Sequence, residues 1–113
     1  MHEMSLAGGV LQLVEETAVR EGAQRVKLVV LEIGRLSAVE PEALRFCFAA
    51  VTRGTIAQDA ALEIIDIPGA GTCLACGATV PMTEQWGKCP ACGGGFLQPS
   101  AGTEMRVREI EIE

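Results

Sequence analysis

Residues 73–93 read CLACGATVPMTEQWGKCPACG and contain two Cys-X-X-Cys-Gly motifs, with twelve residues between the inner cysteines. Two residues between paired cysteines allow both sulfurs to reach one ion at about 2.3 Å while the backbone makes a tight turn. The glycine after each pair tolerates a positive φ, so that backbone N–H groups can point at the thiolates. The spacing predicts one four-thiolate site typical of structural Zn²⁺, with these ligands: Cys73, Cys76, Cys89 and Cys92.

Two other chemistries compete for these cysteines. Rubredoxin-like iron shares the Cys-Pro-X-Cys-Gly motif, and a tetrahedral set of four sulfurs does not distinguish iron from zinc. A thioredoxin-like redox pair is disfavoured, because neither motif opens a helix in a βαβ setting. A saturated four-thiolate site leaves no open position for a substrate, so the pattern favours a structural role.

The composition is that of a small acidic domain. The chain has 113 residues and a formal net charge of −6, and 49% of its residues are hydrophobic but only 4% aromatic. A core of small aliphatic side chains gains from an added metal staple. An acidic surface repels phosphate backbones, which disfavours nucleic-acid binding.

The pattern of the chain predicts a cytoplasmic protein. The first residues do not have the basic and apolar regions of a signal peptide. We also expect no membrane insertion, since no run of about 20 apolar residues is present. In a reducing compartment, paired cysteines more often bind metal or carry out redox reactions than form structural disulfides.

Two helices are predicted from apolar periodicity. The first covers residues 4–21, with an apolar face made of Leu6, Val10, Leu13, Val14 and Thr17. The second ends near Gly54, and its apolar face includes Cys47, which we interpret as a core residue. Its start has two interpretations: Ser37 with Glu40 resembles a capping box, or Pro41 is the first helical residue after Glu40. The apolar face of the second helix is Leu44, Cys47, Phe48 and Val51.

Strands are predicted over residues 25–34, 61–67 and 105–112. The first is too apolar for simple alternation, so we expect it to be covered on both faces or to meet a partner. Residues 68–102 hold four cysteines and four of the five prolines, and they have no helical period. The predicted fold is α+β: two helices pack on a three-stranded sheet, and a zinc-ribbon-like four-cysteine loop is inserted between the last two strands.

This pattern also predicts the domain organisation. Residues 1–67 with residues 103–113 are expected to form an α/β body. Residues 68–102 are expected to form a separate zinc-binding loop domain.

The only histidine, His2, lies at a position with specific metal chemistry. Terminal residues are usually frayed, but the helix predicted from residue 4 would anchor this one. The Met1 amine, the His2 backbone nitrogen and the imidazole Nδ1 can close two chelate rings, and a backbone nitrogen or the carboxylate of Glu3 could complete the set. Planar nitrogen ligation favours Ni²⁺ or Cu²⁺ over Zn²⁺. An exposed site whose donors must lose protons suits metal delivery better than catalysis.

Several segments together resemble one known family. They are the Met-His-Glu start, the strand end Glu-Ile-Gly at 32–34, the segment Pro-Glu-Ala-Leu-Arg-Phe-Cys-Phe at 41–48, and the late cysteine motifs followed by a closing strand. Their order and spacing over nearly the whole chain resemble HypA/HybF, the hydrogenase nickel-incorporation proteins.

The resemblance implies a function and two metal sites. It implies a nickel metallochaperone that helps to deliver Ni²⁺ to the large subunit of [NiFe] hydrogenase, with a HypB-type GTPase as partner. Some members also support urease maturation. Nickel binding maps onto Met1, His2 and Glu3, which makes the α/β body the nickel-binding part, and the zinc site maps onto the four cysteines. Some members carry metal-binding histidines near the zinc loop, and this chain has none there.

The residues leave two other functions to weigh. A zinc-ribbon adaptor or nucleic-acid-binding module would make His2 irrelevant, but the chain lacks a basic stripe and has few aromatic residues for base stacking. A rubredoxin-like electron carrier would require iron in the four-cysteine site. We do not expect an enzyme, because no nucleophile has a nearby base and no glycine-rich loop leads from a strand into a helix.

Overall fold

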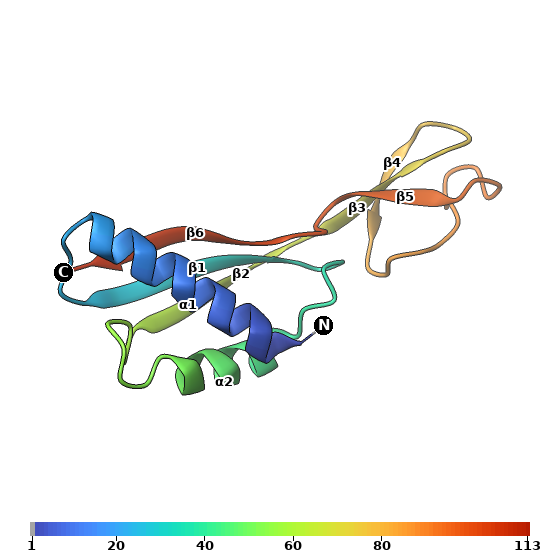
Figure 1. Cartoon of the computed structure of the whole chain (residues 1–113). Coiled ribbons are helices and arrows are strands. Elements are labelled where there is room, and N and C mark those ends of the chain that lie inside the picture. The colour runs from blue at the N-terminus through green and yellow to red at the C-terminus, as the bar shows by residue number, and fades with distance from the viewer. Residues whose placement is uncertain (1) are drawn as a thin grey trace. The chain divides into compact units, whose positions relative to one another are not determined.

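The computed structural model describes residues 2–113, which form two helices and two three-stranded sheets (Figure 1). One sheet has the strand order β2-β1-β6 and the other β4-β3-β5. The predicted α+β class is confirmed, while Met1 lies outside the described residues. The elements in chain order are α1 (Glu3–Arg20), β1 (Val26–Gly34), α2 (Pro41–Val51), β2 (Ala61–Ile67), β3 (Gly69–Cys73), β4 (Thr79–Met82), β5 (Leu97–Ala101) and β6 (Met105–Ile112).

The chain divides into two compact units. We call the first the helical unit; it comprises the segment that ends at Leu31, Val39–Ile65 and Arg106–Glu113. We call the second the cysteine unit; it comprises Glu32–Ala38 and Asp66–Met105. The predicted division into an α/β body, residues 1–67 with 103–113, and a zinc-binding loop domain, residues 68–102, stays a prediction.

The central strand of the first sheet is buried on both of its faces. Val29, Val30 and Leu31 follow one another in β1, and all three side chains are buried. Because successive side chains of a strand point to opposite faces, this burial means that both faces are covered. The structure therefore favours the first of the two interpretations of this apolar run.

Helix α1 buries part of the predicted stripe, since Val10 and Val14 are buried as expected. It packs against α2, and its fully buried positions include Ala7 and Ala18, whereas the predicted Leu13 is 45% exposed. The two additional buried positions, Ala7 and Ala18, carry small side chains, which allow close approach of neighbouring elements. The buried residues of α1 are Ala7, Val10, Val14 and Ala18.

Helix α2 begins with the second of the two predicted arrangements. Glu40 is its N-cap, and the Glu40 carboxylate accepts a hydrogen bond from the Glu42 N–H at 3.3 Å. Pro41 follows in the first turn, where its missing N–H costs nothing. The Ser37 hydroxyl instead donates to the Gly34 carbonyl at 2.7 Å, so it is no cap of this helix.

Cys47, interpreted from the sequence as a core residue of this helix, is half-buried.

The cysteine unit contains a second sheet that the sequence did not reveal. Strand β3 lies between β4 and β5 and pairs with each of them in antiparallel fashion. The inserted four-cysteine loop is thus a small sheet with two cysteine motifs attached. Backbone hydrogen bonds join the segment after β1 to the start and the end of this insertion: the Arg35 N–H donates to the Ile67 carbonyl at 2.9 Å, and the Leu36 N–H to the Gly102 carbonyl at 2.7 Å.

Candidate metal centres

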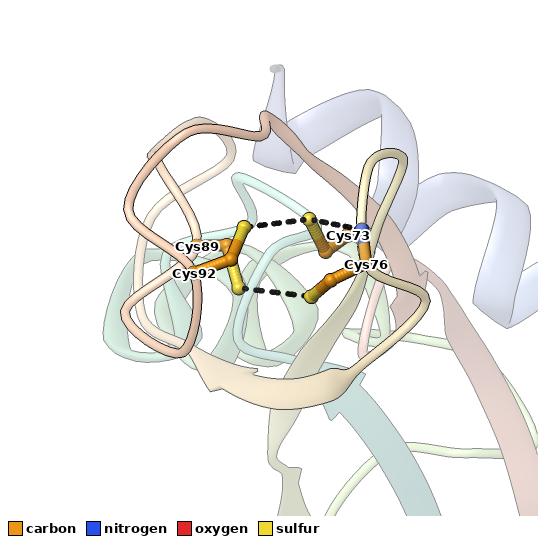
Figure 2. A group of neighbouring side chains, drawn as sticks. All are labelled: Cys73, Cys76, Cys89 and Cys92. Atoms are coloured by element: carbon orange, nitrogen blue, oxygen red, sulfur yellow. Dashed lines mark hydrogen bonds between the residues drawn. The ribbon is translucent and has the colours of Figure 1, made fainter.

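The structure brings the four predicted cysteines together (Figure 2). Cys73 ends β3, and Cys76 follows in the next turn, while the other two lie in the second cysteine motif. The Sγ atoms of Cys73 and Cys92 are 3.7 Å apart, and those of Cys76 and Cys89 are 3.8 Å apart. All four sulfur atoms lie within 4.8 Å of one another.

This spacing fits one tetrahedral ion. Ligands at about 2.3 Å from zinc stand about 3.8 Å from each other at the corners of a tetrahedron. The two sulfur–sulfur distances match that edge, and none of the five cysteines is in a disulfide. The four cysteines could therefore hold a structural zinc ion, and the part of the chain described by the structure contains no other such group of three or more histidine, cysteine or acidic residues.

The backbone of each cysteine motif supports the sulfurs. The N–H groups of Ala75 and Cys76 both point at the Cys73 Sγ, each at 3.3 Å. Gly77 and Gly93, which follow the two pairs, have φ values of 77° and 73°. Both adopt the positive φ that the sequence predicted for these glycines, and their N–H groups donate to the carbonyls of Cys73 and Cys89.

Contacts within this motif shift the pKa values of the Cys73 and Cys76 thiols in opposite directions. The N–H of Cys76, with that of Ala75, lowers the pKa of the Cys73 thiol to about 6. The Ala78 N–H favours the thiolate of Cys76, but the hydrogen bond to Cys73 and burial outweigh it and raise the pKa of Cys76 to about 11. At neutral pH, Cys73 therefore carries a thiolate stabilised by its neighbours. A divalent ion must displace the remaining protons, which links metal binding to pH.

The four cysteine residues differ in their exposure to solvent. Cys73 is 2% exposed and Cys89 is 1% exposed, whereas Cys76 and Cys92 are exposed. The first cysteine of each motif is thus a buried residue and the second an exposed one, while all four sulfurs are directed toward one another (Figure 2).

At the other candidate site, the described part begins with His2. His2 is the N-cap of α1 and is exposed, and its side chain makes no capping hydrogen bond. Its carbonyl accepts the first helical hydrogen bond, from the Leu6 N–H at 3.1 Å. The predicted ligand Met1 lies outside the described residues, so the complete nickel set stays a prediction.

The third predicted nickel residue, Glu3, is held by α2. Its Oε2 accepts a hydrogen bond from the Glu40 N–H at 3.2 Å. This bond, with a further one from its own N–H, lowers the pKa of the Glu3 carboxyl. Sequence reasoning missed the contact with Glu40, because no local pattern relates two residues that are 37 positions apart.

The start of α1 leaves the first four backbone nitrogens, those of residues 2–5, outside the helical ladder. The first N–H groups of a helix have no intrahelical acceptor. The nitrogens of His2 and Glu3 belong to this set, since Leu6 is the first residue that donates within the helix to His2. A metal that binds these nitrogens would not have to break a helical hydrogen bond.

Among the described residues, no helix has the length and apolar character needed to cross a membrane.

Comparison with known proteins identifies the family. Residues 1–112 match the family described as "Hydrogenase/urease nickel incorporation, metallochaperone, hypA". The chain is 74% identical over 113 residues to hydrogenase maturation factor HypA of Dechloromonas aromatica and 59% identical to that of Albidiferax ferrireducens, with full coverage of both chains in each case.

Solved structures agree with this match. The solution structure of the Ni metallochaperone HypA from Helicobacter pylori is 26% identical, with a TM-score of 0.70 and coverage of 99% of this chain and 97% of that one. The solution structure of a second HypA protein is 28% identical, with a TM-score of 0.74 and coverage of 100% and 97%. The chain therefore belongs to the HypA family of nickel-incorporation metallochaperones.

Proposed function

We propose that this protein binds Ni²⁺ at its amino terminus and passes the ion on for maturation of the large subunit of [NiFe] hydrogenase. The observation that carries the proposal is the place of His2, an exposed N-cap at the beginning of a helix in a chain of a nickel metallochaperone family. In this proposal nickel is cargo. It is taken up and given up again.

The proposed donors are the Met1 amine, the backbone nitrogen and imidazole of His2, and a nitrogen or the carboxylate of Glu3. Planar nitrogen donors suit Ni²⁺. The exposure of His2 supports release to an acceptor, since a partner can reach an ion there. The contact between Glu3 and Glu40 supports affinity, because donors on a helix start that is held in place lose less conformational entropy when they bind.

For the four-cysteine site we propose a structural role. A Zn²⁺ ion held by Cys73, Cys76, Cys89 and Cys92 would join the two cysteine motifs and leave no open coordination position. The protein would then carry out no turnover of its own. GTP hydrolysis would come from a HypB-type partner in the cytoplasm.

A direct test is calorimetric titration of Ni²⁺ into the zinc-loaded native chain. A His2→Ala variant and a chain extended by one residue before Met1 are the comparison proteins. We expect both changes to abolish high-affinity nickel binding, because each removes a donor of the chelate, and to leave zinc content and helix content unchanged. Unchanged nickel affinity in the extended chain would reject the proposed site.

One observation favours a second candidate function for the cysteine unit. Trp86 and Phe96 are 77% and 65% exposed, which is unusual for large apolar side chains and typical of a contact surface. An adaptor or nucleic-acid-binding module would use such residues. Salt-dependent binding of RNA or DNA by the zinc-loaded chain would support this alternative, and no binding at low salt would remove its nucleic-acid form.

A further inference from the structure

Three consecutive glycines follow the second cysteine motif, and they differ in their surroundings. Gly93 has a φ of +73° and open space where a Cβ would stand. Gly94 has neither a positive φ nor any neighbour within 4 Å of that position. At Gly95 a Cβ would overlap with the Sγ of Cys73, and it would also lie 2.9 Å from the Cβ of Ala75. Among these three glycines, Gly95 alone lies where a side chain would collide with its neighbours.

The backbone around Gly95 is fastened to both cysteine motifs. The Gly95 carbonyl accepts a hydrogen bond from the Cys89 N–H at 2.8 Å, and the Phe96 carbonyl accepts one from the Leu74 N–H at 3.1 Å. The Leu97 N–H donates to the Gly87 carbonyl at 3.1 Å. The segment 95–97 therefore cannot move away from Cys73 without breaking hydrogen bonds.

The Cys73 sulfur is equally constrained from its own side. Cys73 is buried, and its sulfur accepts hydrogen bonds from the N–H groups of Ala75 and Cys76, so the sulfur has one favourable position. The segment at Gly95 lies against this sulfur. The absence of a side chain at residue 95 is what allows the two to be in contact.

We propose that Gly95 is a positioning residue of the four-cysteine metal site, which keeps the Cys73 sulfur directed at the other three sulfurs and closes the buried side of the site. The proposal rests on the metal-holding role proposed above for the four cysteines. A methyl group at residue 95 has two outcomes. Either the Cys73 sulfur leaves the tetrahedron, or the segment 95–97 separates from the motifs; both speed metal loss.

The test compares Gly95→Ala with Gly94→Ala, which adds the same methyl group one residue earlier, where space is free. Each variant is loaded with Co²⁺, whose sulfur-to-metal charge-transfer absorption grows with the number of bound thiolates. We expect Gly94→Ala to match the wild type. We expect Gly95→Ala to have lower charge-transfer intensity per ion and to lose metal to a chelator about ten-fold to a hundred-fold faster, as overpacking of a close-packed site implies.

A third variant separates the sulfur contact from the alanine contact. Gly95→Ala combined with Ala75→Gly removes the 2.9 Å contact but leaves the overlap with Cys73. We expect no rescue of the cobalt spectrum, and full rescue would overturn the role of the sulfur contact. If Gly95→Ala does not accumulate as folded protein, Co²⁺ is added during refolding from urea, where intensity per bound ion still reports the thiolate count.

The outcomes separate the two proposals. Equal spectra and equal release rates for the two alanine variants would overturn the role of Gly95 and leave the four-cysteine site untouched. A wild-type chain that takes up neither Zn²⁺ nor Co²⁺ at the cysteines would instead overturn the metal-holding role on which the proposal rests.

Discussion

The two candidate metal sites are built in opposite ways. The four-cysteine site has four sulfurs from two matching motifs; two of the cysteine residues are buried, and backbone N–H groups are directed at the sulfur of one of them. The amino-terminal site has one exposed imidazole at the first turn of a helix. Closed thiolate sites retain their metal, while exposed nitrogen sites exchange it. This contrast supports the proposal that one ion stabilises the structure and the other is transferred.

The largest expected effect comes from opening the closed site. Cys89→Ser replaces a buried thiolate with a poor ligand, so we expect zinc to be lost and residues 70–98 to lose protection from hydrogen exchange. Loss of a structural metal costs about 4 kcal/mol or more in the affected unit. Elemental analysis and hydrogen exchange measure both effects. Cys47→Ser is the matched control, since the half-buried Cys47 is outside the metal group.

Stoichiometric zinc and unchanged exchange in Cys89→Ser would contradict the structural role of the ion. Loss of zinc from the Cys47→Ser control would also contradict it, because zinc retention would then not depend specifically on the four-sulfur group.

An intermediate effect is expected from acid. The lowered pKa of Cys73, about 6 against an ordinary value of 9.0, means that the folded site keeps this thiolate as the pH falls from 9 towards 6 and loses its stabilisation as the pH passes through 6. Protons therefore compete weakly for this ligand above pH 6, whereas the raised pKa of Cys76 makes them strong competitors for that ligand, so retention of zinc depends on the closed set of four thiolates. A terminal amine takes up its proton near pH 8, by contrast. We expect nickel to leave between about pH 8 and 6 and zinc to leave only at lower pH.

Stepwise dialysis with elemental analysis at each pH checks this order. Release of zinc before nickel, or of both ions in one step, would show that the two sites do not differ in the way described.

The smallest expected effect concerns the hydrogen bond between Glu3, at the start of α1, and Glu40. Glu3→Gln weakens the hydrogen bond from the Glu40 N–H to residue 3, because a neutral amide oxygen accepts less strongly than a carboxylate. We expect the Glu40 amide proton to exchange a few-fold faster, because one charge-assisted hydrogen bond near the surface is weakened. We also expect somewhat weaker nickel binding. Nuclear magnetic resonance measures the exchange.

Glu15→Gln, which neutralises a carboxylate on the same helix, is the control for the change in charge. Equal exchange rates of the Glu40 amide in the wild type and in Glu3→Gln would show that the carboxylate does not hold α1 to α2.

Local patterns predicted most of the fold. The two helices, the three strands of the first sheet and the four cysteines follow from periodicity and from the two-residue spacing of each pair, which act over short stretches of chain. The buried stripe of α1 was predicted only in part: Val10 and Val14 are buried as expected, but Leu13 is exposed and Ala18 is buried instead. Which small side chains are buried depends on the neighbouring elements of the fold, and the periodicity of one segment carries no information about them.

The missed features of the sites have the same origin. The second sheet uses strands of four and five residues rich in glycine, proline and threonine, which lack the usual strand signal. The contact of Glu3 with Glu40 and the fit of Gly95 against Cys73 join residues far apart in the chain. Sequence spacing gives no information on such contacts.

The central claim is that one ion is held and the other is passed on. The most direct measurement is elemental analysis of the untagged chain, loaded with zinc and nickel, before and after exposure to a competing chelator, with His2→Ala treated in parallel. We predict one zinc retained throughout, one nickel bound and then lost by the wild type, and no nickel bound by His2→Ala. Equal nickel uptake by His2→Ala, or loss of both metals at the same rate, would contradict the account.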